Sequence, residues 1–319
     1  MIKIQNISKS YGATKALISL SLCIKKGEFY SLLGPNGAGK TTIINLVGGL
    51  FPPDSGKILI DGKPIEKHSK KVKNRLGIVP QEVALYEELT VHENLQSWAK
   101  INGMAKTGLN NKIDETLRFL GLEEHALQPL SKFSGGMKRR INIAAALLHN
   151  PDILFFDEPT VGIDPQSRFF IYSIFKQLRN QGKTILYTSH YLEEVEMLSD
   201  RIGIIDYGEL VAEGTFEELR EKTGLRESIH FYYQPIDEEK LKVLASSPLM
   251  HSSFSLNGSL EREKCVFIGN KPSEDLSQLV QLFANHHIDL ETIEIKPVGL
   301  EQVYMYFTKT ALRDCLCGK

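Results

Sequence analysis

Hydrophobic and polar positions along the chain predict strands and helices in alternation. Residues 28–33 form a short apolar run before a glycine-rich loop, and residues 43–47 continue after that loop as the start of a helix. Residues 153–156 are apolar at every position, which is typical of a strand buried on both faces of a parallel sheet. Residues 184–189 are a further strand-like run. This alternation predicts an α/β fold.

Two regions depart from the alternation. Residues 1–33 contain short strands joined by turns, and residues 58–62 read as a strand followed by a hairpin turn. Thr90 and Glu93 have the spacing of a capping box, so a helix is expected to begin at Thr90. The pattern then stays mostly helical, which predicts a helical subdomain over about residues 88–150.

The pattern changes again after about residue 224, which predicts a second domain. Strand-like runs alternate there with helix-like ones, at residues 229–233, 237–245, 265–268, 274–284 and 288–295. This order is typical of a small α+β sandwich of roughly ferredoxin-like type. We therefore expect domains over residues 1–223 and 224–308, and a tail over residues 309–319.

Composition narrows the class of protein. The chain has 319 residues, of which 42% are hydrophobic and 24% charged, as in ordinary soluble globular proteins. Lysine and arginine total 38 against 39 aspartates and glutamates, so bulk charge gives no support for nucleic-acid binding. No apolar run approaches the roughly 20 residues of a membrane helix, and the N-terminus lacks a signal-peptide core. We therefore expect a cytoplasmic protein.

The four cysteines do not indicate a metal site. They form no C-x-x-C pair, and only Cys315 and Cys317 lie close together in the sequence. We expect these two to be reduced residues of a surface tail rather than metal ligands or a redox pair.

The glycine-rich loop carries the strongest chemical signal. It reads Gly34-Pro35-Asn36-Gly37-Ala38-Gly39-Lys40-Thr41-Thr42 and fits the phosphate-loop pattern G-x-x-x-x-G-K-[ST]. Glycines let the backbone amides approach a phosphate, and the following helix directs its positive end at the same anion. Lys40 can reach the β- and γ-phosphate oxygens, and the Thr41 hydroxyl can ligate Mg²⁺. We expect this loop to bind a nucleoside triphosphate.

Further motifs name a family. Ser134-Gly135-Gly136-Met137 opens a helix and leaves its N-terminus accessible to an anion. Gln81 follows one predicted strand, Asp157 and Glu158 end another, and Asp164 and His190 come later. Together with the phosphate loop, these residues resemble an ATP-binding cassette (ABC) transporter ATPase over roughly residues 1–220.

The resemblance implies a nucleotide site for ATP and Mg²⁺. By this resemblance Tyr11 stacks on the adenine of ATP. Residues Gly34–Thr42 form the Walker A loop, and residues Ser134–Met137 form the signature motif. The signature would contact the γ-phosphate bound to the opposite subunit, and Asp164 would lie in the dimer contact. The implied metal-binding residues are Thr41, Gln81 and Asp157, the last through water.

The resemblance also implies the residues of ATP hydrolysis: Glu158 as general base, His190 as the switch histidine, Lys40 on the phosphates and Gln81 as sensor of the membrane partner. Two acids in sequence at a strand's end point in different directions, so one can face the metal and the other the attacking water. His190 can donate to the γ-phosphate.

The family's fold is a RecA-like core with an antiparallel β subdomain and a helical subdomain. Its partners would be a second copy of the chain and a separate integral membrane permease, with the protein on the inner face of the cell membrane. Phe133 and Met137 depart from the commonest signature residues, but Ser134 and Gly136 are intact. Residues 137–140 and the C-terminal stretch 293–304 resemble a bacterial multidrug- and ion-exporter subgroup.

Two alternatives remain beside the exporter interpretation. One is a soluble ABC ATPase in translation or repair, although the chain holds one cassette and no heptad run separates Lys40 from Ser134. The other is a regulatory ATPase that binds a membrane protein without transporting anything. A neighbouring reading frame with about six apolar segments would favour transport.

Overall fold

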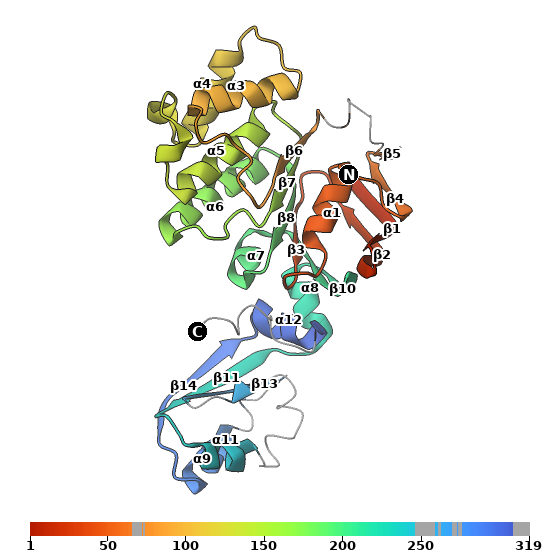
Figure 1. The fold of residues 1–319 in the computed structure, drawn as a ribbon. Helices are drawn as coiled ribbons and strands as arrows, with labels where there is room; N and C mark the ends of the chain where they lie inside the picture. Colours follow the sequence, from red (N-terminus) through yellow and green to blue (C-terminus); the bar gives the residue numbers. More distant parts are fainter. Residues whose placement is uncertain are drawn as a thin grey trace. The chain divides into compact units, whose positions relative to one another are not determined.

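Figure 1 shows the computed structural model, which describes residues 1–65, 72, 74–245, 259–260, 263–269, 273 and 276–308. The chain divides into two compact units, Met1–Val211 and Ala212–Lys319. This boundary precedes the one expected near residue 223, because α8 (Phe216–Thr223) packs against α12 (Leu300–Thr308) near the end of the chain. No helix of the described residues is long and apolar enough to cross a membrane.

A small antiparallel sheet begins the first unit. Its strand order is β2-β1-β4-β5, with bounds Thr14–Ile24, Ile2–Tyr11, Ser55–Ile60 and Lys63–Pro64. Ile4 pairs with Leu22 and Ile2 pairs with Ile60, and all four side chains are buried. The alternation of buried and exposed positions along β1 therefore places one face of this sheet in the core.

The central sheet has the order β10-β9-β3-β8-β7-β6. The strands are β3 (Phe29–Leu33), β6 (Leu76–Val79), β7 (Ile153–Asp157), β8 (Thr184–Ser189), β9 (Arg201–Asp206) and β10 (Glu209–Gly214). Neighbours from β9 to β6 are parallel. Their carboxyl ends therefore meet at one edge, where open α/β sheets bind ligands.

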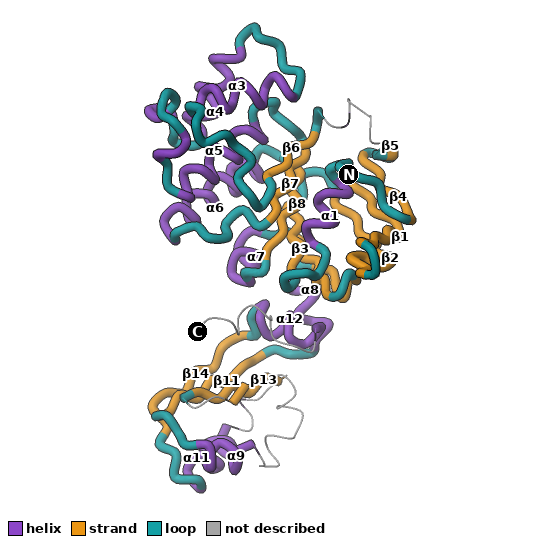
Figure 2. Tube along the Cα trace, in the orientation of Figure 1, coloured by secondary structure: helices purple, strands orange, loops and turns teal. Residues whose placement is uncertain are grey.

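The two faces of the central sheet have different covers (Figures 1 and 2). Ile153 and Phe155 of β7 pack into a core with α1 (Lys40–Val47) and the antiparallel sheet. Leu154 and Phe156 point the other way, into a core with helices α3 to α6. These helices are Val91–Ile101, Leu109–Phe119, Gly135–Leu147 and Pro165–Asn180. The phosphate-loop helix and the helical subdomain therefore lie on opposite faces.

The helical subdomain begins as the sequence predicts. Thr90 caps α3, and its hydroxyl and Glu93 exchange the reciprocal hydrogen bonds of a capping box. A second capping box, between Thr215 and Glu218, begins α8. One further helix, α7 (Leu192–Leu198), follows β8 and was not expected from the sequence pattern.

The second unit is a four-stranded antiparallel sheet with helices on one face. The elements follow in the order β11 (Glu227–Tyr233), α9 (Glu238–Ala245), β12 (Ser259–Leu260), β13 (Lys264–Gly269), α11 (Leu276–Asn285) and β14 (Leu290–Pro297). The strand order β12-β13-β11-β14 is the ferredoxin-like arrangement expected from the sequence. Phe231 and Cys265 of the sheet share a core with Leu279 and Phe283 of α11. Cys315 and Cys317 lie outside the described residues.

Candidate active site

The phosphate loop joins β3 to α1 and needs glycine at its tightest point. Gly39 has a φ of 106° and caps α1, so any other residue is strained there. A Cβ on Gly39 would also lie 2.6 Å from the carbonyl oxygen of Ala16. No acidic residue occupies the first turn of α1, so the positive end of the helix remains available to an anion.

Lys40 extends back into this loop. Its side chain is 4% exposed, and its ammonium donates to the carbonyl oxygens of Gly34 at 2.7 Å and Pro35 at 3.0 Å. The same ammonium lies 2.9 Å from Oε1 of Glu158, whose side chain is equally buried. The loop thus holds one positive charge that a phosphate can engage.

Glu158 follows the last residue of β7 in an unusual backbone conformation. Its φ is 43°, and its N–H donates to the carbonyl oxygen and the hydroxyl of Thr188 on β8, at 3.2 and 3.0 Å. A non-glycine residue in this region is sparsely populated and is frequently functional. These hydrogen bonds hold the Glu158 backbone beside Lys40.

The carboxylate of Glu158 also contacts His190. The distance from His190 Nδ1 to Glu158 Oε2 is 3.0 Å. Burial acts to raise the pKa of Glu158, but the hydrogen bond from His190 and the charge and hydrogen bond of Lys40 lower it to about 2. An ionised carboxylate only accepts hydrogen bonds, so Nδ1 of His190 carries the proton in this contact.

Asp157, the last residue of β7, has other hydrogen-bond partners than Glu158. The Thr188 hydroxyl donates to its Oδ1 at 2.7 Å, and the Thr41 hydroxyl also hydrogen-bonds to the carboxylate. Burial raises the pKa of Asp157, although both hydroxyls act to lower it. A nearby cation would offset the cost of this buried charge.

The oxygen atoms of Thr41 and Asp157 fit Mg²⁺. This ion binds through one or two protein oxygens, several waters and the phosphates of its substrate rather than through a protein cage. Within the described parts of the chain, no group of three or more His, Cys, Asp or Glu side chains forms such a cage. The donor set therefore suits a metal that arrives with a nucleotide.

Gln81 lies at the carboxyl end of the edge strand β6 and is exposed. The loop is held by Arg139 of α5, which donates to the carbonyl oxygen of Pro80 at 2.7 Å and to that of Gln81. Arg139 is buried, and its contact with this loop was not expected from the sequence. It connects the Gln81 loop to the signature helix by hydrogen bonds to backbone atoms, which no sequence motif specifies.

The signature residues lie away from the phosphate loop of the same chain. Ser134 caps α5 by accepting a hydrogen bond from the Met137 N–H at 3.3 Å, and Gly135 is exposed with open space around it. Because α5 and α1 cover opposite faces of the central sheet, Ser134 does not join Lys40 in one site within the chain.

Asp164 lies beside the signature helix and caps α6 through the Ser167 N–H at 2.9 Å. A Cβ on Gly136 would lie 2.3 Å from Ser167 Oγ, so the starts of α5 and α6 are in close contact.

Tyr11 ends β1, with 49% of its surface exposed and its ring edge-on to Phe51. Its exposed ring is available for stacking.

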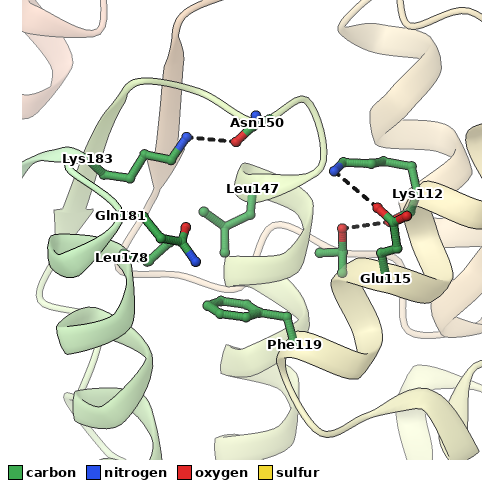
Figure 3. Close-up of a pocket in the computed structure, with 9 residues that line it drawn as sticks. Lys112, Glu115, Phe119, Leu147, Asn150, Leu178, Gln181 and Lys183 are labelled. Carbon is green, nitrogen blue, oxygen red and sulfur yellow. Dashed lines mark hydrogen bonds and ion pairs between the residues drawn. The ribbon is translucent and has the colours of Figure 1, made fainter.

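One cavity lies outside this constellation. It has a volume of about 130 Å³ and lies between α4, the end of α5 and the end of α6. Figure 3 shows its two lysines engaged, Lys183 with Asn150 and Lys112 with Glu115. None of the candidate site residues lines this cavity.

Comparisons with known proteins agree with the geometry. The ABC transporter family matches residues 17–161. The linearmycin resistance ATP-binding protein LnrL of Bacillus subtilis is 44% identical, over 98% of this chain and all of its own length. A Nod factor export ATP-binding protein I of Cupriavidus metallidurans is 39% identical over 98% of this chain and 99% of its own.

Two of the solved structures that resemble this chain match about two thirds of its length. The ATP-binding cassette MJ0796, in a dimeric post-hydrolysis state with ADP and Pi, is 30% identical with a TM-score of 0.62. The match covers 67% of this chain and 98% of that one. An ATP-binding subunit of an ABC transporter matches with a TM-score of 0.64 and 29% identity, over 70% of this chain and 93% of that one.

Proposed function

The chain belongs to the ABC transporter family as an ATP-hydrolysing subunit, and we propose that it acts as a homodimer that uses Mg²⁺·ATP to drive export through a separate membrane permease. The alternative of a soluble translation or repair ATPase is not favoured, because the full-length relatives serve drug resistance and Nod factor export. The buried carboxylate of Glu158, which contacts both Lys40 and His190, carries the proposal for hydrolysis.

The proposed hydrolysis assigns one role to each buried group. Lys40 and the loop amides would bind the β- and γ-phosphates, and Thr41 and Asp157 would hold a Mg²⁺ that supplies neutralising charge to the phosphates. Glu158 orients the attacking water and takes its proton. His190 fixes Glu158 and stabilises the γ-phosphate during transfer. Phosphoryl transfer requires mainly positioning and electrostatic stabilisation, and this arrangement offers both.

Phosphate binding would change the strength of Glu158 as a base. A carboxylate with a pKa of about 2 is a weak base near neutral pH. When the Lys40 ammonium binds the phosphates instead, it no longer stabilises the Glu158 carboxylate by charge and hydrogen bond. The burial of Glu158, which raises its pKa, is unchanged. The pKa of Glu158 then rises, and the carboxylate becomes a better base when the substrate is bound.

The open helix start at Ser134 and Gly135 supports the proposed dimer. An exposed helix N-terminus with a serine cap and glycines attracts an anion, and the phosphates bound in the same chain lie across the central sheet. In a two-fold, isologous dimer each signature helix can face the ATP held by the other copy. Asp164, beside that helix, would lie in the same contact.

The direction of transport is proposed from the relatives. The two full-length relatives span both units of this chain and are named for linearmycin resistance and for Nod factor export. We propose that this chain likewise energises export. The cargo would contact the permease, and the exposed loop from Gln81 to the start of α3 would bind that permease.

The hydrolysis proposal is tested with Glu158→Gln. The variant should bind Mg²⁺·ATP and lose roughly 100-fold or more in kcat, since a general base contributes about 10²–10⁴. On sizing with Mg²⁺·ATP it should move from monomer to dimer. Glu193→Gln, an exposed glutamate of α7, is the control and should keep normal activity. A Glu158→Gln protein that hydrolyses ATP normally, or stays monomeric at saturating ATP, refutes this assignment.

The permease is tested separately. Tagged Glu158→Gln is purified with Mg²⁺·ATP from detergent-solubilised membranes, and the proteins that accompany it are identified by mass spectrometry. A stoichiometric protein with several segments of about 20 apolar residues supports the transport proposal. Recovery of the chain alone, or with ribosomes, contradicts it.

A further inference from the structure

Glu194 is a buried carboxylate that lies outside the residues assigned above. It lies in the first turn of α7 and is 1% exposed. Tyr172 donates to its Oε1 at 2.6 Å, and the hydroxyls of Tyr187, Thr160 and Ser189 donate to its Oε2. A buried carboxylate is tolerated when it is hydrogen-bonded, and hydroxyl donors on both oxygens satisfy this one.

The first contact reaches the segment of Glu158. Thr160 comes two residues after Glu158, and its hydroxyl donates to Glu194 at 2.9 Å. Glu158 itself has a left-handed backbone, which persists only when neighbouring contacts enforce it. Thr188 holds the N–H of Glu158 on one side, and Glu194 holds Thr160 on the other.

The second contact reaches the segment of His190. Ser189 donates to Glu194 at 3.1 Å and accepts a hydrogen bond from the Tyr191 N–H at 2.9 Å. The residues on both sides of His190 are therefore fixed by one hydroxyl. The His190 ring also packs on the Tyr191 ring, with 4.2 Å between the centroids.

The third contact reaches α6, the helix that Asp164 begins. Tyr172 lies on this helix, and Nε of Arg168 lies 3.8 Å from Glu194 Oε1. The Arg168 guanidinium also lies 5.0 Å from the centroid of the Tyr191 ring. One carboxylate thus binds α6, the residues after Glu158 and the residues around His190.

We infer that Glu194 is a positioning residue that sets the geometry of the Glu158–His190 pair and couples it to the helix begun by Asp164. It acts through Thr160 and Ser189 rather than on substrate. Small displacements of a base or of its partner slow a reaction strongly, whereas the phosphate loop that binds ATP has no part in these contacts. Loss of Glu194 should therefore affect kcat more than KM. This inference rests on the roles proposed for Glu158 and His190.

The test compares Glu194→Gln with Glu193→Gln in the full-length protein. The glutamine keeps the size of the side chain but replaces one acceptor oxygen by an amide NH₂ group. This group cannot accept hydrogen bonds from the hydroxyls or from Arg168. We expect kcat to fall roughly 10- to 100-fold, with KM for ATP within about twofold of the unaltered protein. Glu193→Gln removes the same charge from the same helical turn and should change neither value.

A second measurement separates positioning from general stability. Glu194→Gln is combined with His190→Ala, and the double variant should be slower than His190→Ala by clearly less than the loss that Glu194→Gln causes alone, because Ser189 then has no histidine to position and only the Thr160 contact still acts on Glu158. If Glu194→Gln folds poorly, Ser189→Ala removes only one hydroxyl of the same chain of contacts and should also lower kcat with KM unchanged.

Two results overturn the inference: a normal kcat in both Glu194→Gln and Ser189→Ala, or a loss in Glu194→Gln that multiplies fully with that of His190→Ala. A failure of the proposed function looks different. If Glu158→Gln and His190→Ala themselves keep normal kcat, the assigned roles are wrong, whatever Glu194→Gln does.

Discussion

The contact of Glu158 with Lys40 makes a prediction about stability in the absence of nucleotide. Glu158→Gln removes a buried negative charge and leaves the Lys40 ammonium with two backbone carbonyl acceptors. The pKa of Glu158 falls from 4.5 to about 2 in the folded protein. At 1.36 kcal/mol for each tenfold change, this is a stabilisation of about 3 kcal/mol near neutral pH. For a unit of this size, the melting temperature should fall by about 5–10 °C.

The pH dependence of this loss has a definite sign. A carboxyl group whose folded pKa is depressed contributes stability above its unfolded value, here 4.5, and loses it as the pH falls toward 2. The melting temperatures of Glu158→Gln and of the unaltered protein are compared by scanning fluorimetry without nucleotide. Their difference should be constant between about pH 8 and 5 and shrink below 4.5. Equal melting temperatures near neutral pH, or a difference that is still undiminished at about pH 3, would refute the reasoning.

Four further predictions concern other residues. Gly39→Ala should lower stability by about 1–3 kcal/mol and weaken binding of a fluorescent ATP analogue, because its φ is positive and Ala16 blocks a Cβ. Lys40→Met should weaken that binding at least about tenfold and destabilise the protein by about 3–5 kcal/mol, since it leaves Glu158 buried without its cation. Thr90→Ala should cost about 1 kcal/mol by removing the α3 cap and leave kcat unchanged. Removal of residues 225–319 should leave the ATPase rate of the first unit within about twofold, because both cores of that unit lie within it.

Local signals explain why much of the site is predictable from sequence. The phosphate loop, the capping boxes at Thr90 and Thr215 and the fully apolar strand β7 each depend on adjacent residues, and their physical causes act within a few positions. The strand-end positions of Asp157 and Glu158 follow from the same pattern. The parallel sheet then brings the ends of β3, β7 and β8 together without further information.

Contacts between distant segments were not predictable. Arg139 of α5 donates hydrogen bonds to the backbone carbonyls of Pro80 and Gln81. Glu194 accepts hydrogen bonds from hydroxyls of three separate segments. An arginine or a glutamate in a helix gives no sign of such partners, since most are exposed. The short helix α7 was missed because its N-cap, Tyr191, supplies no capping side chain. Strand β10 was missed because its three adjacent apolar residues between two glutamates show no alternation of apolar and polar positions.

The opposing influences on Glu158 connect the fold to the chemistry. Burial between β7 and β8 acts to raise its pKa, and Lys40 and His190 lower it by contact. The fold makes the first influence permanent, whereas the second depends on where the flexible Lys40 side chain is engaged. A nucleotide that takes Lys40 therefore removes the part of the lowering that Lys40 supplies, while burial and the hydrogen bond from His190 remain, so the pKa of Glu158 rises and the carboxylate becomes a stronger base. In the proposed mechanism the group that binds the phosphates thus also controls when the carboxylate can accept a proton from water, and His190 retains the position of Glu158 during that exchange.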